Sequence, residues 1–406
     1  MSDLTFLEKL LDGTYVEWKA LSEVTLPTSN IKWRDSDRTY RYIDLTSVNI
    51  ETKSITETSE IQTSTAPSRA QKLVEKDDVI FATTRPAQQR YCLIDDEYSG
   101  EVASTGYCVL RAKRGEVLPK WILHWIASSD FKKYLEENQS GSAYPAISDA
   151  KVKDFQIPIP CPDNPKKSLE IQAEIVRILD AFIELTTELT TELKARKKQY
   201  DHYLDQLLNF EDGEVEWRTL GSVCRFINGR AYKQTELLEE GKYPVLRVGN
   251  FFTNGNWYYS DLELEEDKYC EAGDLLYAWS ASFGPKIWDG NKVIYHYHIW
   301  KVVPNVDLIL KKYLFYFLAW DTEALKAEQG NGSTMMHVGK GAIEKRLVPI
   351  PSLAKQAYIV AILDKFDALT NSLTVGLPRE IELRQRQYKY YRDLLLSFPK
   401  PEGKIA

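Results

Sequence analysis

The chain has 406 residues, 43% hydrophobic and 27% charged, which is typical of a soluble globular protein with two or three domains. No apolar run reaches membrane-spanning length and the N-terminus lacks a signal-like pattern, so we expect a cytoplasmic protein with no membrane partner. Five scattered cysteines without a Cys-x-x-Cys pair indicate free thiols. The net charge of −7 argues against a uniformly basic nucleic-acid binder but permits local basic patches.

The first predicted element, Phe6–Leu11, resembles the later segment Tyr203–Leu208. An Asp-Gly pair follows each of them, and then a Val-Glu-Trp string, at Val16–Trp18 and Val215–Trp217. The chain therefore begins with the end of a repeat. This order predicts a circular, two-fold arrangement that is cut open at one point.

The first variable region, Val16–Pro160, contains short strand-like runs and helical stretches. Asp78–Thr84 is typical of a strand that enters a polar loop. Apolar residues at helical spacing predict a helical stretch over Leu118–Glu137. A Gly/Ser loop, Gln139–Tyr144, and an Ile-Pro-Ile-Pro string, Ile157–Pro160, follow.

The second variable region, Val215–Pro351, repeats this order of parts. Its strand is predicted at Asp274–Ser280 and its helix at Leu310–Leu325. A Gly/Asn loop, Gly330–Thr334, and a Val-Pro-Ile-Pro string, Val348–Pro351, complete the match. The two regions are therefore predicted to share one fold with diverged surface loops.

Between and after these regions lies a long repeat. Its first string, Gln-Ala-x-Ile-Val-x-Ile-Leu-Asp-x-Phe, occurs at Gln172–Phe182 and Gln356–Phe366, and a second shared string occurs at Arg196–Phe210 and Arg384–Phe398. Apolar residues at alternating spacings of three and four predict a coiled-coil-like seam, with a stutter that does not end the helix. A helix of about 40 residues would be roughly 60 Å long.

The two copies differ in length. The first strings begin at 172 and 356, which is 356 − 172 = 184 positions apart, and the second strings are 384 − 196 = 188 positions apart. The four extra residues lie around Val375–Pro378, where Gly and Pro predict a kink or break. In the first helix the matching part holds two copies of Thr-Thr-Glu-Leu, at Thr186–Leu193.

These strings resemble the specificity subunits of type I restriction–modification enzymes, in the subgroup with a tetrapeptide repeat in the central helix (type IC). The resemblance covers the whole chain and rests on the Gln-Ala-x-Ile-Val strings, the Thr-Thr-Glu-Leu repeat, the Ile/Val-Pro-Ile-Pro strings and Leu377–Gln385. The helical motifs are the most specific part of it.

The fold that this resemblance implies is α+β, with two mixed α/β target-recognition domains related by pseudo-two-fold symmetry and separated by two long antiparallel helices. We place the first recognition domain at 1–160, the central helical spacer at 161–212, the second recognition domain at 213–351 and the C-terminal helical spacer at 352–406.

The function that it implies is non-catalytic DNA reading. Each domain would read one half of a bipartite site in double-stranded DNA. The helices would set the spacer and dock two methyltransferase subunits, and separate restriction subunits would translocate and cut DNA. The chain itself would hold no cofactor, since S-adenosylmethionine, ATP and Mg²⁺ would bind partner subunits.

Motifs for catalysis are missing from the sequence. It lacks an Asn/Asp-Pro-Pro-Tyr/Phe adenine clamp, a phosphate-binding Gly-x-x-x-x-Gly-Lys-Ser/Thr loop and a nuclease-like carboxylate cluster. His296 and His298 could place two imidazoles on one strand face, but a third metal ligand at suitable spacing is missing. We therefore predict neither an enzyme nor a metal site.

The DNA-contacting residues are expected on polar loops, because Arg, Lys, Asn and Gln read base edges while basic and hydroxyl groups hold phosphates. For each of them a merely solvated or buried role remains the alternative. In the first domain the candidates are Lys32, Arg34, Arg38, Thr83, Thr84, Arg85, Gln88, Gln89, Arg90, Ser140, Ser142 and Tyr144. In the second they are Asn228, Arg230, Tyr232, Lys233, Arg247, Asn250, Trp279, Ser280, Ser282, Lys286, Asn331, Ser333, Thr334, His337 and Lys340. The candidate spacer residues are Thr186, Glu188, Leu189, Thr190, Glu192 and Leu193.

Two other functions remain open at this point. One is a stand-alone DNA-binding regulator with two reading domains, which would not co-purify with a methyltransferase. The other is a coiled-coil adaptor that recognises proteins, which would not select a DNA site.

Overall fold

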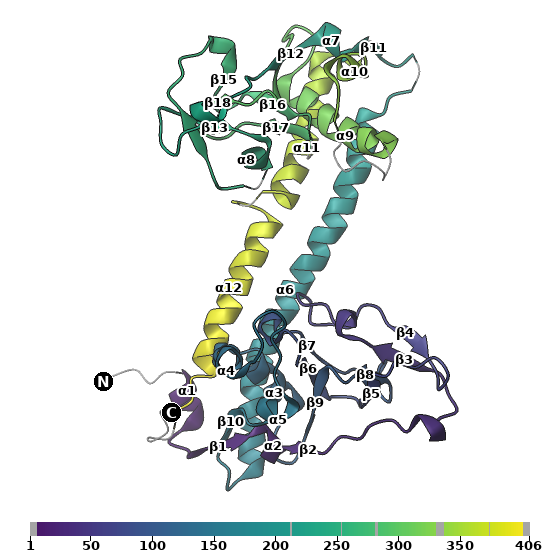
Figure 1. The fold of residues 1–406 in the computed structure, drawn as a ribbon, viewed down its shortest axis with the longest axis vertical. Helices are drawn as coiled ribbons and strands as arrows, with labels where there is room; N and C mark the ends of the chain where they lie inside the picture. Colours follow the sequence, from purple (N-terminus) through teal and green to yellow (C-terminus); the bar gives the residue numbers. More distant parts are fainter. Residues whose placement is uncertain are drawn as a thin grey trace. The chain divides into compact units, whose positions relative to one another are not determined.

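The computed structural model describes residues 6–211, 213–252, 254–280, 283–329, 337–372 and 374–400. The chain divides into two compact units. Unit 1 consists of Met1–Thr190 with Glu380–Ala406, and unit 2 of Thr191–Arg379. Each unit therefore combines one globular domain with a part of the long helices (Figure 1).

The described part of unit 1 has two four-stranded sheets, ordered β2-β9-β6-β7 and β4-β3-β8-β5, and a two-stranded ribbon, β1-β10. Strands β3 and β8 run parallel. The strands are β1 (Val16–Ala20), β2 (Thr25–Leu26), β3 (Tyr40–Ile43), β4 (Ser59–Ile61), β5 (Ala70–Leu73), β6 (Val79–Ala82), β7 (Tyr91–Leu93), β8 (Val102–Ser104), β9 (Tyr107–Ala112) and β10 (Gln156–Pro160). The helices of its domain are α1 (Phe6–Leu11), α2 (Leu21–Val24), α3 (Pro119–Ile126), α4 (Ser129–Asn138) and α5 (Asp149–Lys153).

Unit 2 repeats this topology in its described residues, with sheets β12-β19-β16-β17 and β14-β13-β18-β15 and the ribbon β11-β20. Strands β13 and β18 are its parallel pair. The strands are β11 (Glu216–Thr219), β12 (Cys224–Asn228), β13 (Tyr243–Leu246), β14 (Tyr258–Ser260), β15 (Tyr269–Cys270), β16 (Leu275–Ala278), β17 (Gly284–Ile287), β18 (Val293–Tyr295), β19 (Ile299–Pro304) and β20 (Leu347–Ile350). The helices of its domain are α7 (Leu220–Val223), α8 (Val248–Phe252), α9 (Lys311–Gln329) and α10 (Lys340–Glu344).

The Pro-rich strings form the two ribbons. Trp18 pairs with Pro158 and Trp217 pairs with Pro349, each in an antiparallel register. A two-stranded ribbon accepts these prolines because a proline, which lacks an N–H, is tolerated on a strand with a free edge. The prediction of one fold in two copies is confirmed down to the register of these strands.

The main core of each unit lies between its first sheet and the long helices. In unit 1, Phe81 of β6 and Trp121 of α3 pack with Ile175 and Leu179 of α6 (Pro165–Leu208) and with Leu395 of α12 (Leu377–Leu395). In unit 2, residues of β16, α9, the end of α6 and α11 (Leu353–Thr370) pack in the same way. The apolar seam of each long helix is thus buried against a recognition domain as well as against another helix.

Helix α6 is continuous over 44 residues, so the stutter does not interrupt it. In both Thr-Thr-Glu-Leu tetrapeptides the first Thr and the Leu are half-buried, while the second Thr and the Glu are exposed. The hydroxyl of Thr186 donates to the Phe182 carbonyl at 2.8 Å and that of Thr190 to the Thr186 carbonyl at 2.7 Å. The two tetrapeptides therefore present equivalent faces.

The second copy of the repeat is broken into α11 and α12, as Gly and Pro predict. Gly376 has φ +86°, and a Cβ at this position would clash with the Ala368 carbonyl oxygen. Pro378 follows at the second position of α12, where its missing N–H breaks no helical hydrogen bond. The extra residues of this copy thus span the break, with Val375 and Gly376 in the link and Leu377 and Pro378 at the start of α12.

The predicted helical stretch over Leu118–Glu137 is two helices, α3 and α4. Ser128 caps α4, because its side chain accepts a hydrogen bond from the Phe131 N–H at 3.1 Å. An N-cap serine satisfies an N–H that the helix leaves free, and so it favours a new helix start. Periodicity alone could not show this break, since apolar residues continue on both sides.

Candidate nucleic-acid interface

The repeated glutamine anchors each recognition domain to its long helix. Gln172 is fully buried and its side-chain oxygen accepts from the Leu118 N–H, at the start of α3, at 3.0 Å. Gln356, equally buried, accepts from the Leu310 N–H, at the start of α9, at 2.8 Å. Each amide nitrogen donates to the carbonyl two residues before that N–H. One repeated side chain therefore satisfies the same helix start in both units.

The repeated aspartate forms a second anchor. In unit 1, Asp180 accepts from Lys120 at 2.6 Å and from the buried His124 at 3.0 Å. Burial raises the pKa of the Asp180 carboxyl, but hydrogen bonds from His124 and Lys120 outweigh it, so the pKa lies below its usual value. The carboxylate is therefore charged in the folded protein at neutral pH.

Unit 2 builds the same anchor with a different partner. Asp364 accepts from Lys312 at 2.6 Å and from the hydroxyl of Tyr316 at 2.7 Å. Tyr316 stands where unit 1 has His124. Burial, reinforced by the adjacent Asp364, raises the pKa of Tyr316, so its hydroxyl stays protonated and remains a donor.

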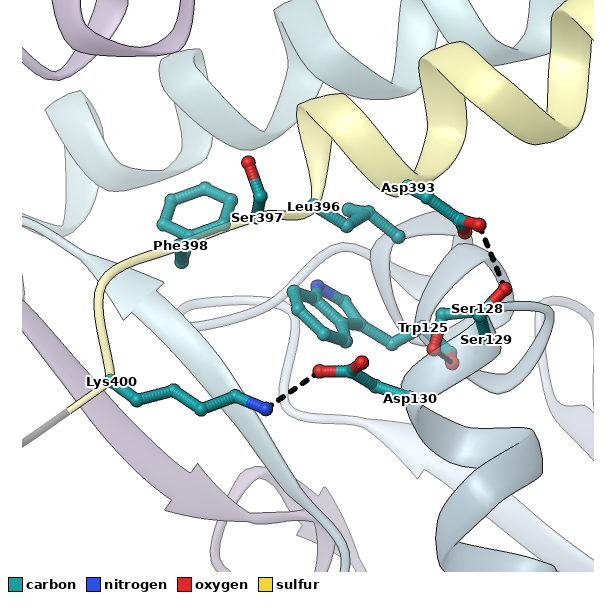
Figure 2. A pocket seen from close by; sticks show the side chains of 9 residues that line it. All are labelled: Trp125, Ser128, Ser129, Asp130, Asp393, Leu396, Ser397, Phe398 and Lys400. Carbon is teal, nitrogen blue, oxygen red and sulfur yellow. Dashed lines mark hydrogen bonds and ion pairs between the residues drawn. The ribbon is translucent and has the colours of Figure 1, made fainter.

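A third repeated side chain is the aspartate of the second string, Asp205 in α6 and Asp393 in α12. Near the end of each helix it binds a side chain of the recognition domain. Figure 2 shows Asp393 of α12 bound to the hydroxyl of Ser129, at 2.7 Å, and Lys400 paired with Asp130, at 2.8 Å. These residues border a hollow of about 290 Å³ in unit 1. In unit 2 the equivalent aspartate, Asp205, accepts from the Trp320 indole at 2.6 Å.

Some candidates of the first domain lie together in one loop pair. Strand β6 ends at Ala82, and the N–H of Arg85 donates to the Pro145 carbonyl at 2.7 Å. The Arg85 guanidinium lies 5.6 Å from the centre of the exposed Tyr144 ring. Thr84 and Ser140 both bridge to the backbone of Ala146. The structure thus joins the loop after the strand to the Gly/Ser loop, which contains the exposed Ser142.

Several other candidates of this domain already have partners within it. The Thr83 hydroxyl is buried and donates to the Gly106 carbonyl at 2.9 Å. Arg90 donates to the Val48 carbonyl at 3.0 Å. Arg38 pairs with Glu101 at 3.2 Å. These interactions tie the three side chains to their own domain, although Arg38 is exposed, as are Lys32, Arg34 and Gln88.

Lys53 is a residue beside this loop that the sequence did not single out. Its ammonium donates to the Gln89 carbonyl at 2.5 Å and lies 4.4 Å from the Tyr91 ring centre. Burial, with the nearby Arg90, lowers its pKa to about 8. No sequence signal could identify Lys53, because it lies 36 residues from Gln89 in an unremarkable polar segment.

The second domain has an equivalent loop pair. Strand β16 ends at Ala278, Ser280 bridges to His337, and the Val338 N–H donates to the Trp279 carbonyl at 3.0 Å. Trp279 is half-buried, with its indole N–H donating to the Tyr297 carbonyl at 2.8 Å. The structure therefore brings Trp279, Ser280 and His337 together, as it does Thr84 and Ser140 in the first domain.

Two hollows in this domain collect further candidates. One, of about 440 Å³, is lined by Asn228 and Lys340 together with Arg225 and Lys268. Arg225 and Lys268 were not among the predicted residues, although Arg225 shares strand β12 with Asn228. This hollow thus combines three cationic side chains and an amide with the carboxylate of Glu344, which lies 3.7 Å from the Lys340 ammonium.

The other hollow, of about 350 Å³, is lined by polar residues that include Arg247, Asn250, Tyr258, His296 and His298. His296 and His298 do not share a strand face, because β18 ends at Tyr295 and β19 begins at Ile299. The two imidazoles instead belong to the tight turn between these strands.

The remaining candidates of this domain differ in their surroundings. Arg230 forms two 2.9 Å hydrogen bonds to Glu236, and these bonds, with that of the Lys233 N–H, lower the pKa of Glu236 to about 2. Tyr232 is half-buried and Lys286 lies 3.6 Å from Asp289. Ser282, Asn331, Ser333 and Thr334 lie outside the described residues.

Other kinds of site find no support in the part of the chain that the structure describes. It contains no group of three or more His, Cys, Asp or Glu side chains placed to hold a metal ion. Nor does this described part include a helix both long and apolar enough to cross a membrane.

Known proteins show the same organisation. The family model described as type I restriction modification DNA specificity domain matches residues 26–198 and again 213–383. The EcoR124I/EcoR124II specificity subunit of Escherichia coli is 36% identical over 99% of both chains. A putative type I restriction enzyme specificity subunit of Haemophilus influenzae is 32% identical over 97% of this chain and 98% of its own.

Solved structures support the fold alone. A chain from the type I R-M system superposes with a TM-score of 0.67 at 24% identity, covering 94% of this chain and 97% of its own. A type I S subunit from M. genitalium gives a TM-score of 0.54 at 14% identity, covering 96% of this chain and 98% of its own.

Proposed function

Because this chain belongs to the family of type I restriction–modification specificity subunits, which are non-catalytic, we propose that its two domains each read one half of a bipartite site in double-stranded DNA. This proposal rests on one observation. The two domains are anchored to the helices by the same residue types, but their loops carry different side chains. Gln172 and Gln356 make the same contacts, while Arg85 with Tyr144 and Trp279 with His337 occupy equivalent loop pairs. Two different half-sites require different side chains at equivalent positions of the two domains.

The long helices are proposed to set the spacer between the half-sites. Helix α6 has 44 residues, which at 1.5 Å each make about 66 Å. One turn of B-DNA is roughly 34 Å, so a helix of this length can connect readers placed on successive turns. The uninterrupted course of α6 through both tetrapeptides supports a helical spacer.

The partners are proposed to be two methyltransferase subunits, docked on the helices, and restriction subunits. S-adenosylmethionine, ATP and Mg²⁺ would bind those partners in the cytoplasm, and this chain would direct adenine methylation and cleavage. With a net charge of −7, the chain alone should bind DNA weakly, because few phosphates are neutralised by an acidic protein.

Purification of the tagged chain from cells that express its cognate methyltransferase tests this proposal. We expect both proteins in one complex, and random-site selection with that complex should recover a DNA motif with two separated halves. A chain that binds a bipartite site without the methyltransferase would instead be a stand-alone regulator. A chain that selects no DNA would be an adaptor, and either result would refute the proposal.

A further inference from the structure

Three of the five histidines of this chain gather at one place in unit 2. The His298 ring centre lies 4.8 Å from that of Trp279 and 4.9 Å from that of His296. The His337 ring centre lies 6.0 Å from that of Trp279. His296, His298 and His337, which we call the histidine cluster, therefore surround the loop that follows strand β16.

Tight packing fixes the cluster. A Cβ on Gly229 would clash with the carbonyl oxygens of Tyr295 and His296, so only glycine lets these two backbone segments approach. The Trp279 N–H donates to the His298 carbonyl at 3.0 Å. The turn between β18 and β19 is thus held on one side by the segment at Gly229 and on the other by the backbone of Trp279.

Two members of the cluster, His296 and His298, line the hollow that Arg247 and Asn250 also line. None of the described residues that line this hollow is an aspartate or glutamate. Arg247 lies 5.3 Å from the Tyr258 ring centre, while Arg230, which bridges to His296 through its backbone, is neutralised by Glu236. The hollow therefore combines cationic and imidazole groups without an anion of its own.

The groups that shift the pKa values of His296 and His298 all oppose protonation. Burial, then His298 and Arg247, lower the pKa of His296 to about 4. Burial and His337 lower the pKa of His298. In the absence of an anion these rings are therefore neutral at physiological pH, and an incoming anion would raise their pKa towards the working range of the protein.

We propose that the histidine cluster binds a DNA phosphate of the second half-site and takes up protons when it does so. The inference rests on the proposed function, since it requires that the loops of the second domain meet DNA. A phosphate fits because it supplies the negative charge that the hollow lacks, and backbone phosphates receive a large share of the hydrogen bonds in DNA complexes.

Histidines occupy this place in the second domain alone. Where it has His296, Tyr297 and His298 before strand β19, the first domain has Ser104, Thr105 and Gly106 before the equivalent strand β9. The histidine of the first domain, His124, is buried at the Asp180 anchor. The first domain thus lacks such a cluster, and the group beside its loops whose pKa is lowered is Lys53, to about 8.

The sign of the effect follows from the two states. The imidazoles have a lower pKa in the free protein than in the DNA complex, so the complex holds more protons over the range between the two. Lower pH therefore tightens binding, by up to about tenfold per pH unit for each proton taken up.

The test uses the complex with its cognate methyltransferase and a duplex that carries the mapped site. Affinity is measured from about pH 8 to about pH 6 at constant ionic strength, the range in which a histidine near its ordinary pKa titrates. We expect affinity to rise as pH falls, and the triple variant His296→Asn, His298→Asn, His337→Asn to flatten this slope while the methylated bases stay the same. His202→Asn, which removes an exposed histidine of α6, should keep the slope.

Calorimetry of the unmodified complex provides a measurement that does not depend on the folding of a variant. Titration with DNA in two buffers of different ionisation enthalpy counts the protons taken up. Zero protons, a slope that the triple variant leaves undiminished, or altered half-site bases in that variant would overturn the inference. Failure of the unmodified complex to bind the mapped site at any pH would instead refute the proposed function.

Discussion

The backbone conformation of Arg85 is held by neighbouring residues, because an arginine rarely adopts it on its own. Its φ of +51° is rare for a residue with a side chain, and Pro86 follows it directly. The bond from its N–H to the Pro145 carbonyl and the Tyr144 ring beside its guanidinium hold this conformation. Such strain is typical of functional positions.

Replacing Arg85 with Ala should therefore weaken reading of the first half-site only. If its guanidinium contacts a base edge, the loss is about 1–3 kcal/mol and one position of that half-site becomes degenerate. Methylation mapping of the variant gives the result directly. Arg114→Ala is the matched control, since Arg114 is exposed and follows the opposite end of strand β9. A uniform loss over all sequences would show that Arg85 contacts a phosphate instead.

Gly376 is required by the turn between α11 and α12. Its positive φ and the closeness of the Ala368 carbonyl oxygen both exclude a Cβ at this position. Gly376→Ala should cost more than about 1 kcal/mol, measured as the free energy of unfolding in urea. Gly255→Ala is the control, because that glycine has open space around it. Equal stability of the two variants would show that the turn adapts.

At the scale of elements, the repeated strings are explained by what they bind. Gln172 and Gln356 each satisfy the start of a domain helix, and Asp180 and Asp364 each hold a lysine and a second donor. The second donor is the one feature that differs, as His124 or Tyr316. The repeat is thus a docking surface for a domain as well as a coiled-coil seam.

Gln172→Ala should destabilise unit 1 and Gln356→Ala unit 2, because each leaves a partly buried N–H and a partly buried carbonyl without their side-chain partner. The expected cost is about 1–3 kcal/mol for each variant. Hydrogen exchange should show lost protection at the start of α3 in the first variant and of α9 in the second. Gln206→Ala, at an exposed position of α6, should change neither. Loss of protection in both helices from one variant would contradict independent anchoring.

The sequence predicted best the features that depend on residues close together in the chain. Helical periodicity, the Gly and Pro around position 376 and the strands before each recognition loop were all predictable. The separation of α3 from α4 was not, because it depends on one hydroxyl, that of Ser128. Lys53 and the histidine cluster were not predictable either, since their neighbours are distant in sequence and only the fold brings them together.

At the scale of the whole molecule, we propose that the domains read the two half-sites and that the long helices set the distance between them. Insertion of one further Thr-Thr-Glu-Leu after Leu193 would continue the register of Thr186–Leu193, with its Thr and Leu on the half-buried face. It would lengthen α6 by about 6 Å. The anchors at Gln172 and Gln356 would remain intact, so we expect both domains to fold and to keep their half-sites.

The most direct measurement is a genome-wide adenine methylation map of cells that carry the cognate methyltransferase with this chain, without it, or with the inserted tetrapeptide. We predict a bipartite motif that requires the chain, and a motif with the same two halves and a wider spacer after the insertion. A continuous motif, altered half-site bases, or an unchanged spacer in the insertion variant would contradict this division of roles.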